Sequence, residues 1–251
     1  MEVIKLISLV VPAYNQEKKI KKNIRNLLKV LGTLGIPYEL IVVVDGKTDK
    51  TLEKARQVKS PNLKIFAYKE NRGKGFAVKY GMLKGKGDII GFIDAGMDID
   101  AAGISILLDS MLWRKAEIMV GSKLHPDSKV KYPRSRKVLS WGYRALCRLL
   151  FGFRVRDTQV GLKLFRRNVV KRVFPKLLVK TFAFDVEVLA IANALGYDKI
   201  YEGPIKLRFN KSSSITSTSF WNIVSLMLWD TVAIFYRLRI LRYYKKNRPA
   251  K

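Results

Sequence analysis

Asp94 and Asp98, which follow a short apolar run, are the residues of this chain best suited to chemistry. Residues 89, 90, 92 and 93 are isoleucine or phenylalanine. This run is too short for an ordinary helix and too apolar for a loop, so it predicts a buried strand. Asp94 ends the strand, and Asp98 and Asp100 follow shortly after. Because open α/β sheets bind ligands at the carboxyl ends of their strands, these acids predict a ligand site there.

The chemistry that these acids favour is metal binding. Carboxylate oxygens suit Mg²⁺ or Mn²⁺, and Mg²⁺ usually takes one or two carboxylates and completes its shell with water and substrate phosphates. Asp94 and Asp98 therefore fit a metal that carries a diphosphate. The alternative is that Asp98 or Asp100 caps a following helix, where aspartate is favoured. We prefer the ligand role for Asp94 and Asp98 and the capping role for Asp100.

The elements that position this site alternate between strands and helices. Apolar runs predict strands at residues 6–11, 39–44, 63–67, 89–93 and 117–121. Helical spacing of apolar residues predicts helices at 17–34, at 51–58, up to about residue 84 and at 101–112. This alternation is typical of an α/β protein with a mostly parallel central sheet flanked by helices.

Two further loops at strand ends carry polar side chains. Asp45 ends the second strand and can accept hydrogen bonds from a ribose or a base, although it can also be a plain turn residue before Gly46. The glycine-rich residues 70–75 open a helix. Such a turn offers backbone N–H groups and a positive dipole end to a phosphate, and Lys74 adds charge.

The second half is basic. A loop is expected at residues 123–136, helices at 137–153 and 182–195, an interrupted strand at 156–167, and a strand at 200–209. The helix at 137–153 is amphipathic and can lie in a membrane interface or pack on the core. The final helix, at 220–244, contains Asp230, which argues against a membrane span. Its aromatic and arginine residues favour an interfacial position, with dimerisation or docking on the core as alternatives.

Composition limits the partners. The 251 residues are 48% hydrophobic, which indicates a globular chain: one catalytic domain at 1–212 and a helical appendage at 213–251. The single Cys147 excludes an internal disulfide, which favours a reducing cytoplasmic setting. The net charge of +29 implies an anionic partner: nucleic acid, anionic lipid or a phosphorylated substrate. Neither an RNA-binding aromatic signature nor zinc-finger spacing is present, so nucleic acid is not expected.

Several of these stretches, in this order, resemble a known family. The matching motifs are VVPAYNQE at 10–17, VVDGKTD at 43–49, NRGKGFAVKYGM at 71–82 and GDIIGFIDAGMD at 87–98. Together they resemble the family 2 glycosyltransferases of the GT-A fold. GSK at 121–123, RDTQVGLKLFRR at 156–167 and FAFDVEVL at 182–189 are similar to dolichyl-phosphate glucosyltransferases and related polyprenyl-phosphate hexose synthases.

The chain departs from the family pattern at two places. Val44-Asp45-Gly46-Lys47 stands where the family usually has Asp-Asp-Gly-Ser, and Asp94-Ala95-Gly96 where it usually has Asp-x-Asp. Only Asp45 and Asp94 match directly, and we expect Asp98 to replace the missing second carboxylate.

The resemblance implies a Rossmann-like GT-A domain, a nucleotide-sugar donor and a polyprenyl (dolichyl) phosphate acceptor. It places Asp94 and Asp98 on Mg²⁺ or Mn²⁺. The residues that it places around the nucleotide are Pro12, Ala13, Tyr14, Glu17, Asp45 and Lys74. The cations that become candidates for the acceptor phosphate are Lys123, Arg134, Arg136, Lys163 and Lys211. Asp157 and Asp185 would orient those cations or the sugar.

The implied enzyme inverts the anomeric carbon and acts as a peripheral protein at the cytoplasmic face of the membrane, held by helices 137–153 and 220–244. The RDTQ stretch favours UDP-glucose over GDP-mannose. One rival hypothesis keeps the fold and changes the acceptor to another glycan or lipid. The other is a non-catalytic basic protein that binds anionic surfaces or nucleic acid. The sequence does not indicate an oligomeric state.

Overall fold

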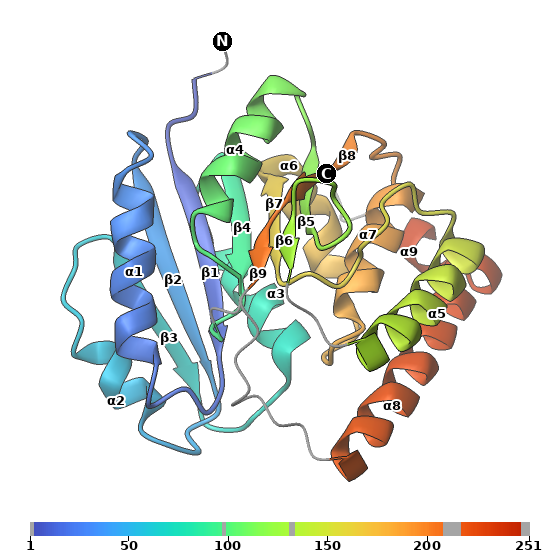
Figure 1. Ribbon diagram of the computed structural model, residues 1–251, viewed down its shortest axis with the longest axis horizontal. Helices are drawn as coiled ribbons and strands as arrows, with labels where there is room; N and C mark the ends of the chain where they lie inside the picture. Colours follow the sequence, from blue (N-terminus) through green and yellow to red (C-terminus); the bar gives the residue numbers. More distant parts are fainter. Residues whose placement is uncertain (1–2, 97–98, 131–133, 208–216, 247–251) are drawn as a thin grey trace.

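A seven-stranded sheet forms the centre of the protein in a computed structural model (Figure 1). The structure describes residues 3–96, 99–130, 134–207 and 217–246, with only the backbone for 134–140, 217–221 and 246. The strand order is β3-β2-β1-β4-β7-β5-β8. The strands are β1 (Ile7–Ala13), β2 (Tyr38–Asp45), β3 (Leu63–Tyr68), β4 (Ile89–Ile93), β5 (Ile118–Ser122), β7 (Leu162–Arg166) and β8 (Ile200–Pro204). A separate pair joins β6 (Lys129–Val130) to β9 (Lys206–Leu207).

Helices cover both faces of this sheet, as Figure 1 shows. The helices are α1 (Ile20–Gly32), α2 (Thr51–Arg56), α3 (Lys74–Lys84), α4 (Gly103–Trp113), α5 (Arg134–Phe151), α6 (Arg167–Val173), α7 (Phe184–Ala194), α8 (Ser217–Phe235) and α9 (Tyr243–Lys246). Apolar side chains of α1, α2 and α4 share one core cluster, and those of α3, α6 and α7 share the other. The sheet is therefore the middle of three layers, which explains why every position of β1 and β4 is buried.

The sheet register decides which loops meet. The strands β1, β2, β3 and β4 are parallel to one another, and β7 runs antiparallel between β4 and β5. In the β4–β7 pair, Ile93 lies opposite Leu162. The end of β4 therefore lies beside the start of β7. Residues just before β7 thus share one edge with residues just after β1, β2, β4 and β5.

The C-terminal helices pack outside α7. Ile234 of α8 and Tyr244 of α9 are fully buried in the same core cluster as α7. The Tyr143 hydroxyl of α5 lies 2.7 Å from the Thr231 hydroxyl of α8, so these two helices also contact each other. Within the described ranges, we find no helix long and apolar enough to cross a membrane.

The predicted fold class is confirmed, and most predicted elements lie within a few residues of their expected bounds. Four boundaries were wrong. Residues 134–136 belong to α5 and not to the preceding loop. The strand expected at 156–167 begins only at Leu162. The strand expected at 200–209 divides into β8 and β9, and the final helix is interrupted by a π-helical turn, η2 (Tyr236–Ile240).

Candidate active site

Asp94 stands at the edge where β4 ends and β7 begins. Its backbone N–H donates to the Gly161 carbonyl at 2.9 Å, just ahead of β7. A Cβ atom on Gly161 would lie only 2.0 Å from Asp94 Oδ2, so no side chain fits at position 161 while Asp94 keeps this position. The Asp94 side chain is 40% exposed. The carboxylate is thus fixed at its base and accessible to a ligand.

Lys74 lies beside this carboxylate. Its ammonium is 2.7 Å from Asp94 Oδ1 and lies over the ring of Phe184. The pair makes close ionic contact, but Asp94 Oδ1 has no well-directed hydrogen bond among the described residues. Burial opposes the charge on Lys74, but the carboxylates of Asp94 and Asp185 outweigh burial and raise its pKa. Lys74 therefore stays positively charged at neutral pH.

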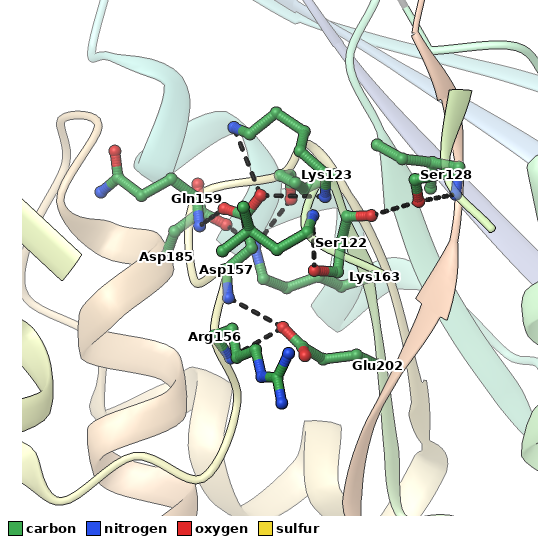
Figure 2. Close-up of polar contacts among 12 residues, drawn as sticks. Ser122, Lys123, Ser128, Arg156, Asp157, Gln159, Lys163, Asp185 and Glu202 are labelled. Carbon is green, nitrogen blue, oxygen red and sulfur yellow. Dashed lines mark hydrogen bonds and ion pairs between the residues drawn. The ribbon is translucent and has the colours of Figure 1, made fainter. Parts of the chain in front are cut away.

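Behind this pair lies a buried ion pair between β7 and α7 (Figure 2). The Lys163 ammonium contacts the Asp185 carboxylate, donates to the Val160 carbonyl at 2.8 Å and lies over the ring of Phe92. Both side chains are almost completely buried. Burial raises the pKa of Asp185 and lowers the pKa of Lys163. Asp185, expected to orient a cation or the sugar, thus holds Lys163 and lies close enough to Lys74 to affect its pKa.

A second acid holds Lys123, the residue that follows β5. Asp157 Oδ2 accepts the backbone N–H of Lys123 at 3.0 Å, and the Lys123 ammonium lies 3.5 Å from the same oxygen. Asp157 is itself held by Glu202 of β8, whose Oε1 accepts the backbone N–H groups of Asp157 and Arg156 at 2.8 and 2.7 Å. Figure 2 shows this chain of contacts from Glu202 through Asp157 to Lys123. The arrangement places an ammonium group at the site edge.

Three N–H groups of the glycine-rich turn before α3 are already bonded within the protein, so fewer are free for a phosphate than the sequence suggested. The N–H of Arg72 donates to Asp45 Oδ1 at 2.7 Å, that of Gly73 to Asn71 Oδ1 at 3.0 Å, and that of Gly75 to the Lys180 carbonyl at 2.8 Å. Gly73 has a φ of 93°, and a Cβ there would lie 2.4 Å from the Lys180 oxygen. The glycines therefore permit close packing on residues 179–184. Lys74 remains the feature of this turn that can contact a phosphate.

The residues expected around a nucleotide surround the ends of β1 and β2. Pro12 and Ala13 are buried in β1, Tyr14 is exposed, and Asp45 is buried under the turn that it holds. Glu17 Oε2 accepts the N–H of Lys50 at 3.2 Å, and the N–H of Glu17 donates to Asp49 Oδ2 at the same distance. The two loops after β1 and β2 thus hold each other in place. Tyr14 is the aromatic side chain of this group, and its ring is exposed to solvent.

Four other expected residues cannot be placed. Asp98 and Lys211 lie outside the described residues, and the side chains of Arg134 and Arg136, at the start of α5, do so as well. Asp100, for which we preferred a capping role, accepts the N–H of Ala102 at 3.1 Å in the turn before α4, but α4 itself has no side-chain cap hydrogen bond.

The oxygen donors that the described residues offer at this edge of the sheet are compatible with a divalent cation. Asp94 is an accessible carboxylate at a strand end, and one carboxylate with water and substrate phosphates is a common Mg²⁺ environment. In the part of the chain that the structure describes, no three His, Cys, Asp or Glu side chains gather to form a metal site. A metal here would therefore depend on Asp94, on Asp98 and on ligand oxygens.

Sequence reasoning missed three residues that build the site. Glu202 holds Asp157, Gly161 makes room for Asp94, and the Asn23 amide donates to the Ala95 carbonyl at 2.7 Å. Glu202 gave the clearest signal, because a carboxylate within a predicted strand favours a hydrogen-bonding partner as the strand packs into the sheet. The partner lies far away in sequence, so the contact could not be named without the structure.

The fold shows the structural class of the protein, and the sequence comparison shows its family. The mostly parallel sheet flanked by helices on both faces is a GT-A fold. The solved structures that match the fold include glucosyl-3-phosphoglycerate synthase from Mycobacterium tuberculosis in complex with Mn²⁺, UDP and phosphoglyceric acid. That match has a TM-score of 0.71 at 19% identity and covers 92% of this chain and 78% of the other. The same enzyme with Mn²⁺, UDP-glucose and phosphoglyceric acid gives a TM-score of 0.69 at 18% identity and covers 92% of this chain and 80% of the other.

The sequence comparison then fixes the family. The family model of glycosyl transferase family 2 matches residues 8–174, so the chain belongs to this family of glycosyltransferases. It is 32% identical to a dolichyl-phosphate beta-glucosyltransferase of Drosophila melanogaster, across 89% of this chain and 74% of that protein. It is 31% identical to a dolichyl-phosphate beta-glucosyltransferase of Homo sapiens, across 94% of this chain and 76% of that protein.

Proposed function

We propose that the protein transfers glucose from UDP-glucose to a polyprenyl phosphate of the dolichyl type, with inversion at the anomeric carbon. The observation that carries this proposal is that residues 157–161 separate two positively charged groups at the carboxyl edge of the sheet. On one side Gly161 contacts Asp94 and Lys74 lies next to it, and on the other side Asp157 holds Lys123. Two separate positive groups suit two anions, a donor diphosphate and an acceptor phosphate.

The donor side is formed by residues from the first half of the chain. Asp94 and Asp98 would hold Mg²⁺ or Mn²⁺, and the residues that would surround the nucleotide are Pro12, Ala13, Tyr14, Glu17, Asp45 and Lys74. A divalent cation, when bound, stabilises the negative charge that develops on the leaving diphosphate. Lys74 contributes to the same stabilisation from the protein side, because its raised pKa keeps it charged.

The acceptor side supplies cations and no strong base. An oxygen of the acceptor phosphate forms the new bond to the anomeric carbon, while the bond from that carbon to the diphosphate breaks and UDP leaves. A phosphate monoester has a second pKa of about 6, so the attacking oxygen is already ionised at neutral pH. Lys123, Arg134, Arg136 and Lys211 bind this phosphate. Lys163, first expected to bind it as well, is buried against Asp185, so we assign it the role of holding residues 160–163 in place.

UDP-glucose is favoured over GDP-mannose as the donor for two reasons. The curated relatives that we report are glucosyltransferases, and the two matching solved structures reported above contain UDP or UDP-glucose. The test incubates the protein with radiolabelled UDP-glucose or GDP-mannose, in separate reactions, and with dolichyl phosphate in liposomes containing Mg²⁺ or Mn²⁺. Labelled lipid from UDP-glucose alone is expected. Labelled lipid from GDP-mannose alone would show that the donor is wrong, and no labelled lipid from either would show that the acceptor is wrong.

The acceptor cannot leave the bilayer, so we propose that the protein acts as a peripheral protein on the cytoplasmic face of a membrane. Exposed apolar side chains on α5 and α8, with Leu149 82% and Trp229 74% exposed, support this proposal. In the view of Figure 1, α8 extends toward the lower end of the molecule, where β2 and β3 also end. Exposed basic residues that follow α8, Arg239 in η2 and Lys245 in α9, suit anionic headgroups.

A further inference from the structure

Two neighbouring side chains in residues 157–161 each carry a buried polar atom without a hydrogen-bond partner. Within the described ranges, Thr158 Oγ1 and Gln159 Nε2 are among the few buried side-chain oxygen or nitrogen atoms that lack one. A buried polar atom without a partner costs free energy, so native proteins keep few of them. Such atoms at a binding edge indicate groups that a ligand will satisfy.

These atoms do not result from a loosely held loop. The backbone before Thr158 is fixed by Glu202, which accepts the N–H of Asp157 at 2.8 Å. The backbone after Gln159 is fixed by Lys163, which donates to the Val160 carbonyl at 2.8 Å, and by Asp94, which donates to the Gly161 carbonyl at 2.9 Å. The two side chains are therefore held between fixed points. Figure 2 shows Gln159 extending away from the Asp157–Lys123 pair.

The position of this pair suggests what it binds. Thr158 and Gln159 lie in the chain between Asp157, which holds the Lys123 ammonium, and Gly161, which contacts Asp94. In the proposed reaction, the group between the acceptor phosphate and the donor diphosphate is the hexose being transferred. A threonine hydroxyl both donates and accepts a hydrogen bond, and a glutamine amide does the same through its two ends. Sugar hydroxyls need such partners.

We propose that Thr158 and Gln159 bind ring hydroxyls of the transferred hexose and so select the sugar. This inference rests on the proposed function and assigns the sugar-binding part of its donor site. The nucleotide and the diphosphate are bound elsewhere, by the groups after β1, β2 and β4. The two residues therefore affect affinity for the nucleotide sugar and leave affinity for the free nucleotide unchanged.

The test compares the affinities of UDP-glucose and UDP for the full chain with Mn²⁺, by isothermal titration calorimetry. Wild type is expected to bind UDP-glucose more tightly than UDP. Thr158→Val and Gln159→Met each weaken UDP-glucose binding by about tenfold, as loss of a hydrogen bond to a bound ligand does, and leave UDP binding within about twofold. Unchanged UDP-glucose binding in both variants, or equal weakening of both ligands, would overturn the inference.

Stability provides a second measurement that separates binding from folding. Valine has nearly the shape of threonine, and the Thr158 hydroxyl has no partner, so Thr158→Val should unfold at the same denaturant concentration as wild type or at a higher one. The matched control is Thr231→Val, because the buried Thr231 hydroxyl contacts the Tyr143 hydroxyl and donates to the Met227 carbonyl at 2.7 Å. The control should unfold earlier and bind UDP-glucose normally. A destabilised Thr158→Val would show that its hydroxyl has a structural role and would overturn the inference for that residue.

Failure of the proposed function has a different signature. A wild-type protein that binds neither UDP nor UDP-glucose would contradict the proposed donor, and this inference with it. A wild-type protein that binds both, with variants that lose neither, would contradict only the assignment of Thr158 and Gln159.

Discussion

The ammonium of Lys74 lies 2.7 Å from the carboxylate of Asp94, the residue proposed to hold a divalent cation. A protein cation and a metal ion next to one carboxylate repel each other. The binding of a nucleotide diphosphate supplies the negative charge that lets both remain. The order of binding that this implies is nucleotide with metal, and not metal alone.

Replacing Lys74 tests this relationship. We expect Lys74→Met to bind Mn²⁺ more tightly than wild type in the absence of nucleotide, because the competing charge is gone. Glucosyl transfer should fall by roughly 10²–10³-fold, because a cation that stabilises the leaving diphosphate is lost. Titration with Mn²⁺ followed by electron paramagnetic resonance measures the first effect. Lys84→Met, at the other end of α3, is the matched control, and weaker Mn²⁺ binding by Lys74→Met would contradict this account.

The buried pair of Lys163 and Asp185 predicts an asymmetric result. Asp185→Asn leaves the Lys163 ammonium buried without its counter-charge, and breaking a buried pair in this way costs about 3–5 kcal/mol of unfolding free energy. The double variant Lys163→Met with Asp185→Leu removes both charges and should recover most of that stability. Urea unfolding measures both. A single variant as stable as wild type, or a double variant as unstable as the single one, would show that the two charges are not coupled.

Glu39 makes stability depend on acid pH. Burial acts to raise the pKa of this carboxyl, but hydrogen bonds from Lys64, Ser8 and the Lys86 backbone outweigh burial and lower its pKa below the ordinary value. Because the folded pKa is the lower one, the stabilisation is present above the unfolded pKa of about 4.3 and is lost as the pH falls through the folded pKa.

Glu39→Gln should therefore reduce the unfolding free energy by about 1–3 kcal/mol at pH 7. The difference from wild type should shrink as the pH falls below about 4. Denaturant unfolding across this pH range measures it, with Glu53→Gln, an exposed position on α2, as the control. A difference that stays constant down to pH 3 would mean that the Glu39 carboxyl does not carry the effect.

The C-terminal helices predict where the protein meets lipid. Aspartate in place of Leu149 and Trp229 puts charge on two exposed apolar positions of α5 and α8, so sedimentation with anionic liposomes should decrease by about tenfold or more. Trp113→Asp is the matched control, because Trp113 is 81% exposed on α4, outside the C-terminal helices. Equal loss of liposome binding in the control and in the double variant would contradict this prediction. It would mean that the added negative charge weakens binding wherever it is placed.

Local patterns predicted the strands and the first acids of the site because each depends on neighbouring residues. The run at 89–93 followed by Asp94 identified β4 and its carboxyl end directly. The helix boundaries after residue 130 were harder to predict, since tertiary packing decides where basic segments such as 123–136 become helical. The resemblance made Lys163 a candidate for the acceptor phosphate, and no local pattern showed that Asp185 would hold it in the interior.

Contacts between residues far apart in the chain could not be predicted from local sequence patterns. Lys163 of β7 pairs with Asp185 of α7, and Glu202 of β8 holds the backbone of Asp157, which lies before β7. In each case the two partners belong to different elements of the fold. At the turn of residues 70–75, the sequence could not show that the Lys180 carbonyl, which comes from another part of the chain, accepts the Gly75 N–H.

The most direct test of the central claim is the initial rate of lipid-linked glucose formation from UDP-glucose and polyprenyl phosphate in liposomes, with Mn²⁺. Wild type should form this product and lose it when the metal is chelated. Asp94→Asn should be reduced by at least about 10²-fold, while Asp127→Asn, whose side chain is 79% exposed, should retain the wild-type rate. An Asp94→Asn variant that forms lipid-linked glucose at the wild-type rate would contradict the account.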